Sequence, residues 1–525
     1  MAGSWGANPE ELESLSVSMT RASDRLGQMS REATSALHAD IWRGSDAQRS
    51  RSQWDGTLRP QLENVVASLS QCSELLRDHA REQREASRVE SGSSYGVFGE
   101  TDMLSGTPGL AEGSLSPPPP ESSSPAETAA WWNRLTAAQK ERIIADHPEW
   151  IGNRDGVDFA SRDRANRALL DDELGRAIAN RDALVATRDK VLAQQPHVKG
   201  GWAGFVDLIY TGDEVLDQFI INDLNDKIKY AQERVDSNMA LRSVLKKAES
   251  SHLLLFDASG LKTKAAVSIG DVDTADHVAV YTPGVSTRVE TSIDGCVRDM
   301  INLRDKTESV LMQHNRSDET VATVAWLGYE APDNPLERQD DILNFSRNTF
   351  SDQRAKIGGR DLASFYTGID ASRDSDAHVV ALGHSYGSLT TSEALQKSGT
   401  HVDDVVFFGS PGLNIDDAGD LDISGSAYLM EAEDDVVADF GAFGGDASNV
   451  SGIEHLLTSA TEETTESRGH SEYLRGQSTS QLNMASVVAD CPEDAYYGLN
   501  IDKGDLVREA LARFDPTRPI LVRLP

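Results

Sequence analysis

The chain has 525 residues and a formal net charge of −35 at pH 7, from 85 acidic and 50 basic side chains. This length is enough for two or three domains with large cores. An acidic surface repels phosphate backbones and anionic lipid headgroups, so the composition argues against nucleic-acid binding and against polybasic membrane binding.

Targeting signals and cysteines limit the location of the chain. No stretch approaches eighteen consecutive apolar residues, so we expect no transmembrane helix. The N-terminus lacks the basic and apolar regions of a signal peptide, which argues against general secretory export. Cys72, Cys296 and Cys491 are scattered without metal-ligand spacing and fit a reducing compartment, with a disulfide between Cys296 and Cys491 left open.

Residues 1–88 predict an antiparallel hairpin of two long helices. Apolar residues recur at intervals that mostly alternate between three and four, which is typical of a helix that pairs with another helix. The turn falls at Trp42-Arg43-Gly44, and Pro60 should kink the second helix or shift its start. The apolar positions are Leu12, Leu15, Met19, Ala22, Leu26, Met29, Ala33 and Leu37, then Leu58, Leu62, Val65, Leu69, Cys72 and Leu76.

The Trp42-x-Gly44 turn resembles that of the WXG100 family, small helical hairpins linked to type VII secretion. The resemblance implies a helical protein partner for residues 1–88 and export without a cleavable signal peptide by a type VII-like system. The export tag of that family, a tyrosine followed four positions later by an acid, is not met, because Tyr95 has Gly99 at that place. The alternative is a cytoplasmic protein whose hairpin serves only docking or dimerisation.

Two segments separate the hairpin from the first predicted strand. Residues 89–126 are rich in proline, serine and glycine, and their composition predicts a linker stiffened in part by polyproline II structure at Pro117 to Pro120. Residues 127–250 predict several helices, the first of them after Thr136. We expect this region to pack as a helical layer on the domain that follows.

Residues 251–525 predict an α/β domain. Three short apolar runs at 253–256, 265–269 and 278–281 are separated by turns and indicate an antiparallel start. Strands and helices then alternate as far as residue 432, which predicts a doubly wound, mostly parallel sheet. Such a sheet places its site at the carboxyl ends of the strands.

The pentapeptide Gly383-His384-Ser385-Tyr386-Gly387 lies where a predicted strand, 378–382, meets a predicted helix, 388–396. A Gly-x-Ser-x-Gly sequence at such a junction makes a sharp turn that exposes the serine hydroxyl. Both glycines are needed because the turn leaves no room for β-carbons. Ser385 is therefore the predicted nucleophile, whereas the preceding His384 should point away from it and pack.

A serine nucleophile needs a base and an acid, which follow it in the chain order serine, acid, histidine. We predict His470 as the base, because it lies in a loop-like stretch, whereas its rival His455 lies in a helix-like run. We predict Asp434 as the acid, because Asp434 and Val437 fit the turn that follows a strand ending near residue 432. Asp435 is the alternative acid.

Acyl transfer also needs N–H donors that bind the oxyanion. The first predicted donor is the amide of Tyr386, directly after the nucleophile. The second should come from the loop 282–287, where Gly284 permits close approach and Val285 or Ser286 supplies the amide.

Several segments in order are similar to the actinobacterial α/β-hydrolase family of undefined substrate, and the resemblance covers residues 127–490. It implies an α/β-hydrolase fold with Ser385, Asp434 and His470 in the triad positions, and it supplies no substrate. The similar segments are Trp131-Trp132, Pro148 to Gly156, Arg162 to Arg167, Leu253 to Val289, Val324 to Tyr329, Gly383 to Gly387 and Phe408 to Gly412.

We therefore expect a serine hydrolase of the esterase or lipase kind that cleaves a small-molecule or lipid-like acyl ester through acyl-Ser385. His470 acts as base and then as acid, and Asp434 orients it. Water is the second substrate, so no metal or organic cofactor is implied. The alternative is a secretion-linked interaction protein with a non-catalytic hydrolase core, which a fluorophosphonate probe would fail to label.

Overall fold

The computed structural model describes residues 115–194, 213–333, 352–438 and 441–498, together with a few isolated positions before residue 78. The chain divides into two compact units, residues 1–110 and 111–525. Apart from those isolated positions, the predicted hairpin of residues 1–88 lies outside the described residues, so the described architecture is that of the second unit.

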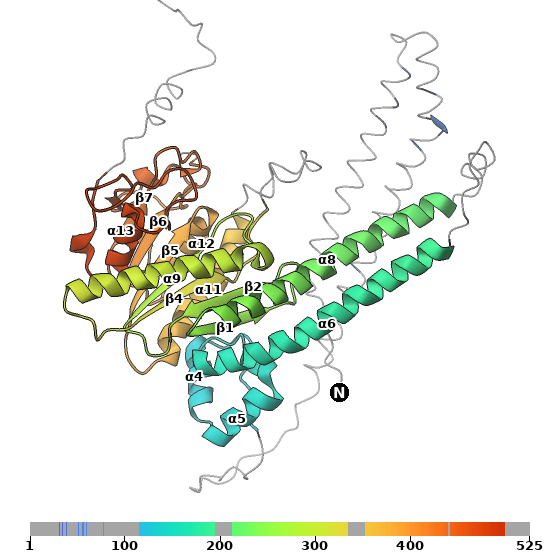
Figure 1. The fold of residues 1–525 in the computed structure, drawn as a ribbon, viewed down its shortest axis with the longest axis horizontal. Helices are drawn as coiled ribbons and strands as arrows, with labels where there is room; N and C mark the ends of the chain where they lie inside the picture. Colours follow the sequence, from blue (N-terminus) through green and yellow to red (C-terminus); the bar gives the residue numbers. More distant parts are fainter. Residues whose placement is uncertain are drawn as a thin grey trace, which may run out of the picture. The chain divides into compact units, whose positions relative to one another are not determined.

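An eight-stranded sheet forms the centre of the second unit (Figure 1). Its strands are β1 (Ser251–Asp257), β2 (Lys264–Ile269), β3 (His277–Thr282), β4 (Val321–Leu327), β5 (His378–His384), β6 (Asp404–Phe408), β7 (Ala427–Met430) and β8 (Glu454–Leu456). Their order along the sheet is β1-β2-β4-β3-β5-β6-β7-β8. β2 runs antiparallel to both of its neighbours, β1 and β4, and all other neighbouring strands are parallel. The predicted doubly wound, mostly parallel sheet with an antiparallel start is confirmed.

The helices cover both faces of the sheet or lie beside it. They are α4 (Pro125–Asn133), α5 (Ala137–Asp146), α6 (Phe159–Gln194), α8 (Asp213–Lys247), α9 (Val289–Gln313), α11 (Gln353–Ser372), α12 (Tyr386–Leu395) and α13 (Thr479–Val488). Residues of α8, α9 and α13 share one core with the sheet, and residues of α11 and α12 share a second core on its other face. Successive residues of β3, such as Val280 and Tyr281, belong to opposite cores. This burial on both faces explains why the parallel strands read as continuous apolar runs.

Side chains from the helical segment bind the backbone of β1, the strand at the edge of the sheet. Asn166 Nδ2 donates to the Leu253 carbonyl at 3.0 Å, and the Leu253 N–H donates to Asp163 Oδ1 at 2.5 Å. Asn153 exchanges two hydrogen bonds with the backbone of Phe256, at 2.7 and 2.8 Å. These bonds satisfy edge groups that would otherwise be open to pairing with another chain.

The helical segment begins with two short helices, each of which starts with a capping box. Ser124 and Glu127 form the box of α4, and Thr136 and Gln139 form that of α5. The long helices α6 and α8 then lie side by side and extend beyond the sheet (Figure 1). The segment therefore combines a small cluster beside the sheet with a projecting helical pair.

The end of the predicted linker, 89–126, packs on this helical segment, which corrects its C-terminal boundary. Leu115 packs on the apolar cluster that contains Trp131 and Trp132. Arg154 Nη1 donates to the Pro119 carbonyl at 2.8 Å. A proline-rich stretch makes no backbone hydrogen bonds within itself, so a neighbouring guanidinium can bind its carbonyls. That tertiary contact is not visible in the composition.

His455 lies in β8, which corrects the helix-like reading of its surroundings. The strand has only three residues and pairs in parallel with β7, where His455 stands opposite Leu429. A short apolar run has no periodicity that separates strand from helix, so pairing at the edge of the sheet decides the structure here.

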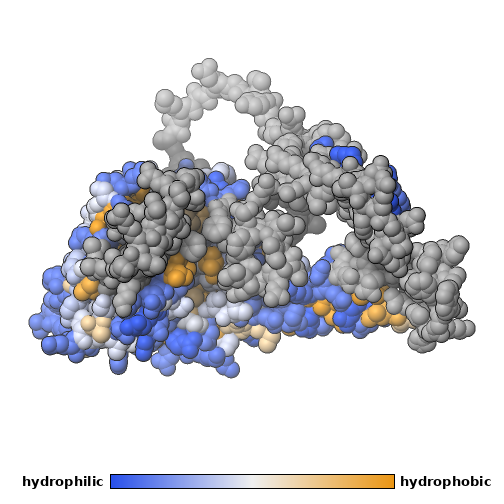
Figure 2. Space-filling model, turned by 90° about the horizontal axis from the view of Figure 1, so that it is seen from above, coloured by the Kyte–Doolittle hydropathy of each residue, from blue (hydrophilic) through white to orange (hydrophobic). Residues whose placement is uncertain are grey.

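Most of the described surface in Figure 2 is hydrophilic, with apolar residues in small separate groups. This agrees with the excess of acidic side chains in the sequence. Among the described residues, the helices are all too short or too polar to span a bilayer.

Candidate active site

Ser385 occupies a strained turn between β5 and α12. Its backbone angles are φ 55° and ψ −131°, a combination that side chains rarely adopt, and its exposed fraction is 3%. The Ser385 N–H donates to the Phe408 carbonyl at 3.0 Å, and the Ser388 hydroxyl donates to the Ser385 carbonyl at 2.6 Å. The surrounding strand and helix therefore hold the serine in this conformation.

The predicted glycines lie where backbone segments approach most closely. A β-carbon on Gly387 would collide with the Thr282 carbonyl oxygen, and one on Gly383 would lie 2.7 Å from the α-carbon of Ser388. A β-carbon on Gly284 would lie 2.9 Å from the Ser385 hydroxyl oxygen. The loop after β3 therefore approaches the serine directly, as the sequence predicts.

The loop after β3 is held at two points. The Tyr329 hydroxyl donates to the Pro283 carbonyl at 2.6 Å. The Ser286 N–H donates to the Pro332 carbonyl at 2.8 Å. This second bond engages one of the two amides that the sequence left open as oxyanion donors, which favours Val285.

His470 lies against Asp435. Its Nδ1 is 2.9 Å from Oδ1 and 3.0 Å from Oδ2 of the carboxylate, so Nδ1 is the protonated ring nitrogen. The Asp435 side chain is fully buried and also accepts from the Tyr473 hydroxyl at 2.6 Å and from the Val437 N–H at 3.0 Å. Burial alone would raise the pKa of Asp435, but the hydrogen bonds from His470, Tyr473 and the Ala438 N–H, together with the charge of His470, outweigh it and leave that pKa below its usual value.

The structure corrects the choice of Asp434 as the acid. Asp434 has φ 66°, its side chain is 72% exposed, and its carboxylate lies 3.5 Å from Arg468 instead of facing His470. The left-handed residue directs the chain so that the next carboxylate, that of Asp435, faces inward. Asp435, the alternative that the sequence left open, is the carboxylate that the structure places beside His470.

His470, Asp435 and Ser385 gather at the carboxyl end of β6. Phe408, the last residue of β6, accepts the Ser385 N–H. A β-carbon on the next residue, Gly409, would lie 2.9 Å from Asp435 Oδ2 and 3.2 Å from His470 Cε1. Gly409 therefore lies next to the acid and the imidazole. It directly follows Phe408, whose carbonyl accepts the Ser385 N–H.

His384 packs beneath the imidazole of His470. The two ring centroids are 4.8 Å apart, and His384 Nε2 lies 2.8 Å from the carbonyl oxygen of His470. His384 also stacks on Phe408, with centroids 5.1 Å apart. It joins the turn before Ser385 to the backbone that bears the predicted base.

Comparison with known proteins places the chain in a family. Residues 259–444 match the family described as alpha/beta hydrolase. Uncharacterized protein Mb0988c of Mycobacterium bovis is 37% identical over 226 residues, which are 41% of this chain and 80% of that protein. The chain belongs to the alpha/beta hydrolase family. Uncharacterized protein Rv2079 of Mycobacterium tuberculosis is 32% identical to this chain over 305 residues, 55% of this chain, and the chain spans only 40% of that relative.

Solved structures similar to this chain include the dienelactone hydrolase of Anabaena variabilis, with 11% identity and a TM-score of 0.28. That comparison covers 47% of this chain and 100% of the other. The carboxylesterase EstE1 from a metagenomic library has 12% identity and a TM-score of 0.29, over 51% of this chain and 97% of the other.

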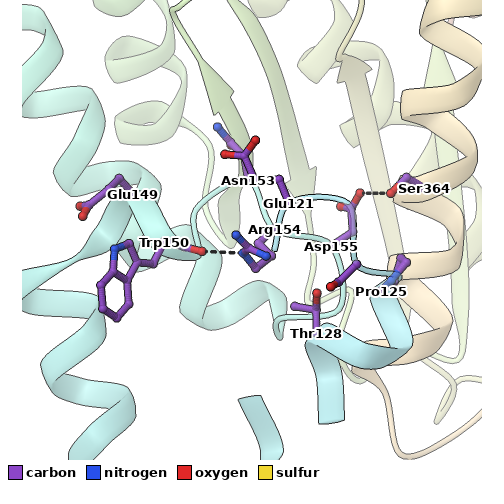
Figure 3. A pocket seen from close by; sticks show the side chains of 10 residues that line it. Glu121, Pro125, Thr128, Glu149, Trp150, Asn153, Arg154, Asp155 and Ser364 are labelled. Atoms are coloured by element: carbon purple, nitrogen blue, oxygen red, sulfur yellow. Dashed lines mark hydrogen bonds between the residues drawn. The ribbon is translucent and has the colours of Figure 1, made fainter. Parts of the chain in front are cut away.

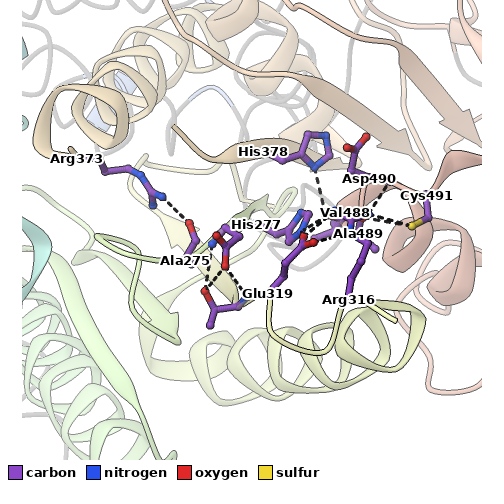
Figure 4. Close-up of polar contacts among 12 residues, drawn as sticks. Ala275, His277, Arg316, Glu319, Arg373, His378, Val488, Ala489, Asp490 and Cys491 are labelled. Carbon is purple, nitrogen blue, oxygen red and sulfur yellow. Dashed lines mark hydrogen bonds and ion pairs between the residues drawn. The ribbon is translucent and has the colours of Figure 1, made fainter. Parts of the chain in front are cut away.

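A second polar cluster lies at the amino ends of the same strands (Figure 4). His277 begins β3 and lies 2.7 Å from Glu319, while His378 begins β5 and lies 2.8 Å from Asp404. Arg316 donates to the Ala489 carbonyl at 2.9 Å. These groups pair with one another at the end of the sheet opposite Ser385, so they stabilise the fold.

One group of side chains beside this cluster could hold a metal ion. His314, Cys491 and Glu493 have donor atoms within 4.8 Å of one another. However, His314 Nε2 lies 2.7 Å from Asp494, and Arg316 Nη1 donates to the Cys491 sulfur at 3.4 Å. A cation would have to displace that guanidinium. Both Cys296 and Cys491 are free and buried, so the disulfide that the sequence left open is not formed.

A cavity of about 310 Å³ lies away from Ser385, between α4, α11 and the turn before α6 (Figure 3). Several of its polar side chains have partners within the protein: Arg154 Nε donates to the Trp150 carbonyl at 2.9 Å, and the Ser364 hydroxyl donates to Asp155 at 2.6 Å. The cavity therefore belongs to the packing of the helical segment.

Sequence reasoning missed two residues that support the site. Tyr473 binds Asp435 and also accepts the Ala432 N–H at 2.8 Å, so it fixes the strand end that bears the acid. Ser388 holds the Ser385 carbonyl. The spacing of Tyr473, three residues after His470, was the available signal for the first. The small polar residue directly after the second elbow glycine was the signal for the second.

Proposed function

We propose that this protein cleaves a small-molecule or lipid-like acyl ester through a covalent intermediate on Ser385. The observation that supports this most is that the buried Asp435 holds the His470 imidazole. Both side chains lie at the carboxyl end of β6, the strand whose last residue binds the Ser385 N–H. A base fixed by an acid beside a serine in a strained turn is the arrangement that nucleophilic acyl transfer needs.

In the first half of the proposed reaction, the Ser385 hydroxyl transfers its proton to Nε2 of His470. Nδ1 is protonated and bound to Asp435, so Nε2 is the nitrogen that can accept a proton. The serine oxygen forms a bond to the ester carbonyl carbon, and the carbonyl oxygen becomes an oxyanion. The bond to the leaving alcohol then breaks as His470 returns its proton to that alcohol, which leaves acyl-Ser385.

In the second half, water gives a proton to His470 and attacks the acyl carbon. The acid product leaves, and Ser385 recovers its proton from His470. Asp435 keeps its negative charge throughout and stabilises the imidazolium, which agrees with a pKa held below its usual value.

Two amides are proposed to bind the oxyanion. Tyr386 is the first residue of α12, and the N-terminus of a helix favours negative charge. Val285 follows Gly284, whose backbone approaches the serine oxygen, and the next amide, that of Ser286, is engaged with Pro332. Tyr386 and Val285 are therefore the proposed pair.

The proposal is tested by a fluorophosphonate probe and a series of p-nitrophenyl esters of graded chain length. We expect one adduct per chain, which tandem mass spectrometry places on Ser385, together with ester turnover that the adduct abolishes. Turnover restricted to short chains indicates an esterase, and turnover of long chains indicates a lipase. An adduct on another residue, or no adduct and no turnover, would overturn the proposal.

Gly284→Ala tests the contact between the loop and the nucleophile. The new β-carbon would lie 2.5 Å from that of Ser385, so the loop must shift away from the serine. Displacing one oxyanion donor costs on the order of 10²–10³-fold in kcat, which is the loss that we expect. Steady-state kinetics on a p-nitrophenyl ester measures it.

The matched control is Gly295→Ala in α9, where a β-carbon meets only the end of the Arg298 side chain at 3.8 Å. This variant should keep the kcat of the wild type. Equal activity of the two variants would contradict the assignment of Gly284.

A further inference from the structure

His384 is fixed by its position in the chain and by one hydrogen bond. It is the last residue of β5, directly before Ser385, and its Nε2 lies 2.8 Å from the His470 carbonyl oxygen. A carbonyl oxygen only accepts, so Nε2 bears the proton and donates it. The residue next to the nucleophile is thereby bonded to the backbone of the proposed base, 86 positions along the chain.

The ring of His384 is enclosed by aromatic groups. It stacks on Phe408 at 5.1 Å, lies 4.8 Å from the His470 ring, and is 5.9 Å from Tyr473, with its plane tilted by 57°. Tyr473 in turn binds Asp435, so His384 contacts the base directly and the acid through one side chain. These contacts accompany the hydrogen bond from His384 Nε2 to the His470 carbonyl.

The environment keeps His384 neutral. Burial, followed by the neighbouring His470 imidazole, lowers the pKa of His384 to about 4. The titratable groups that adjoin it are His470, Asp435 and Tyr473. A neutral ring does not repel the imidazolium that forms on His470, and it keeps its N–H donor throughout the neutral pH range.

The loop that bears His470 has a second backbone tether. The Gly469 N–H donates to the Glu433 carbonyl at 2.7 Å. His470 is therefore held on one side by the end of β5, through His384, and on the other by the residues that follow β7. The loop lacks a helix or strand at this point, so these tethers help to fix where its backbone lies.

We propose that His384 is a positioning residue, which fixes the backbone of His470 so that its imidazole stays aligned with Ser385. The inference rests on the proposed function, because it names the residue that sets the geometry of the same base. A misplacement of about 1 Å costs on the order of 10²-fold in rate, so one such bond can affect catalysis strongly.

His384→Phe and His384→Gln test the proposal. Phenylalanine keeps a ring but has no donor, whereas the glutamine amide can donate to the same carbonyl. We expect His384→Phe to lower kcat about 10–100-fold with little change in KM, and to displace the pH profile of kcat/KM. His384→Gln should restore most of the activity. His384→Leu replaces the phenylalanine variant if that larger ring prevents folding.

The matched control is His378→Phe at the opposite end of β5. It removes a bond to Asp404 at 2.8 Å, so it should lower the melting temperature and leave kcat and the pH profile unchanged. A result in which the His384 variants lose stability but keep the wild-type kcat and pH profile would show a purely structural role and overturn the inference.

Hydrogen–deuterium exchange of the peptide that contains residues 468–471 gives a readout independent of turnover. Exchange should rise in His384→Phe, return to the wild-type level in His384→Gln, and stay at that level in His378→Phe. Unchanged exchange in His384→Phe would overturn the positioning role even if the wild type hydrolysed none of the esters. Wild type without turnover and without a Ser385 adduct would overturn the proposed function instead.

Discussion

Asp435→Asn is expected to lower kcat by about 10⁴-fold, which is the loss seen when the acid of a serine–histidine–aspartate triad becomes an amide. Both carboxylate oxygens of Asp435 already accept hydrogen bonds, from the Val437 N–H on one side and the Tyr473 hydroxyl on the other. An amide NH₂ on either side would face a donor. The asparagine side chain therefore cannot keep all of these hydrogen bonds and would rotate away from this position. His470 would then lose the partner that fixes its tautomer.

Asp434→Asn is the matched control, because it makes the same chemical change one residue away. Its carboxylate is exposed and lies near Arg468, and an exposed ion pair contributes little. We expect kcat to stay within about twofold of the wild type. Stopped or continuous assays with one p-nitrophenyl ester compare the two variants, and circular dichroism shows whether each is folded. A larger loss of kcat in Asp434→Asn than in Asp435→Asn would identify Asp434, the residue that the sequence favours, as the acid.

The contrast between these two residues shows where prediction from the sequence ends. Strand-to-helix alternation and the glycines around Ser385 follow from local rules, and they give the topology and the predicted nucleophile. The choice between adjacent acids depends on one backbone angle, the positive φ of Asp434, and local sequence patterns do not fix that angle. A one-residue difference in a turn exchanges the buried and the exposed carboxylate.

Contacts between distant segments were the other missing information. Asn166 binding the Leu253 backbone and His384 binding the His470 carbonyl join residues 87 and 86 positions apart. Each bond depends on how elements pack in space, which periodicity and motif spacing do not specify. For this reason the sequence predicts a helical layer in general terms but does not indicate that this layer covers the edge strand.

Ser385→Gly is expected to abolish hydrolysis and at the same time to make the protein more stable than Ser385→Ala. Loss of the nucleophile of such a triad costs on the order of 10⁶-fold in kcat, so both variants should be inactive. Their stabilities should differ, because φ 55° and ψ −131° mirror the extended region and suit a residue without a β-carbon. Such strain costs about 1–3 kcal/mol, and glycine removes it. The greater freedom of glycine in the unfolded chain cancels about 0.5–1 kcal/mol of that gain in stability.

Urea unfolding measures the difference, and we expect the free energy of unfolding of Ser385→Gly to exceed that of Ser385→Ala by about 1 kcal/mol. The same pair of substitutions at Ser392, inside α12, should give the opposite sign, because glycine in a helix is about 1 kcal/mol less stable than alanine. If the alanine variant were more stable than the glycine variant at both positions, the turn at Ser385 would store no strain. The turn would then hold the serine through its glycines and the hydrogen bonds to Phe408 and Ser388, without a cost in stability.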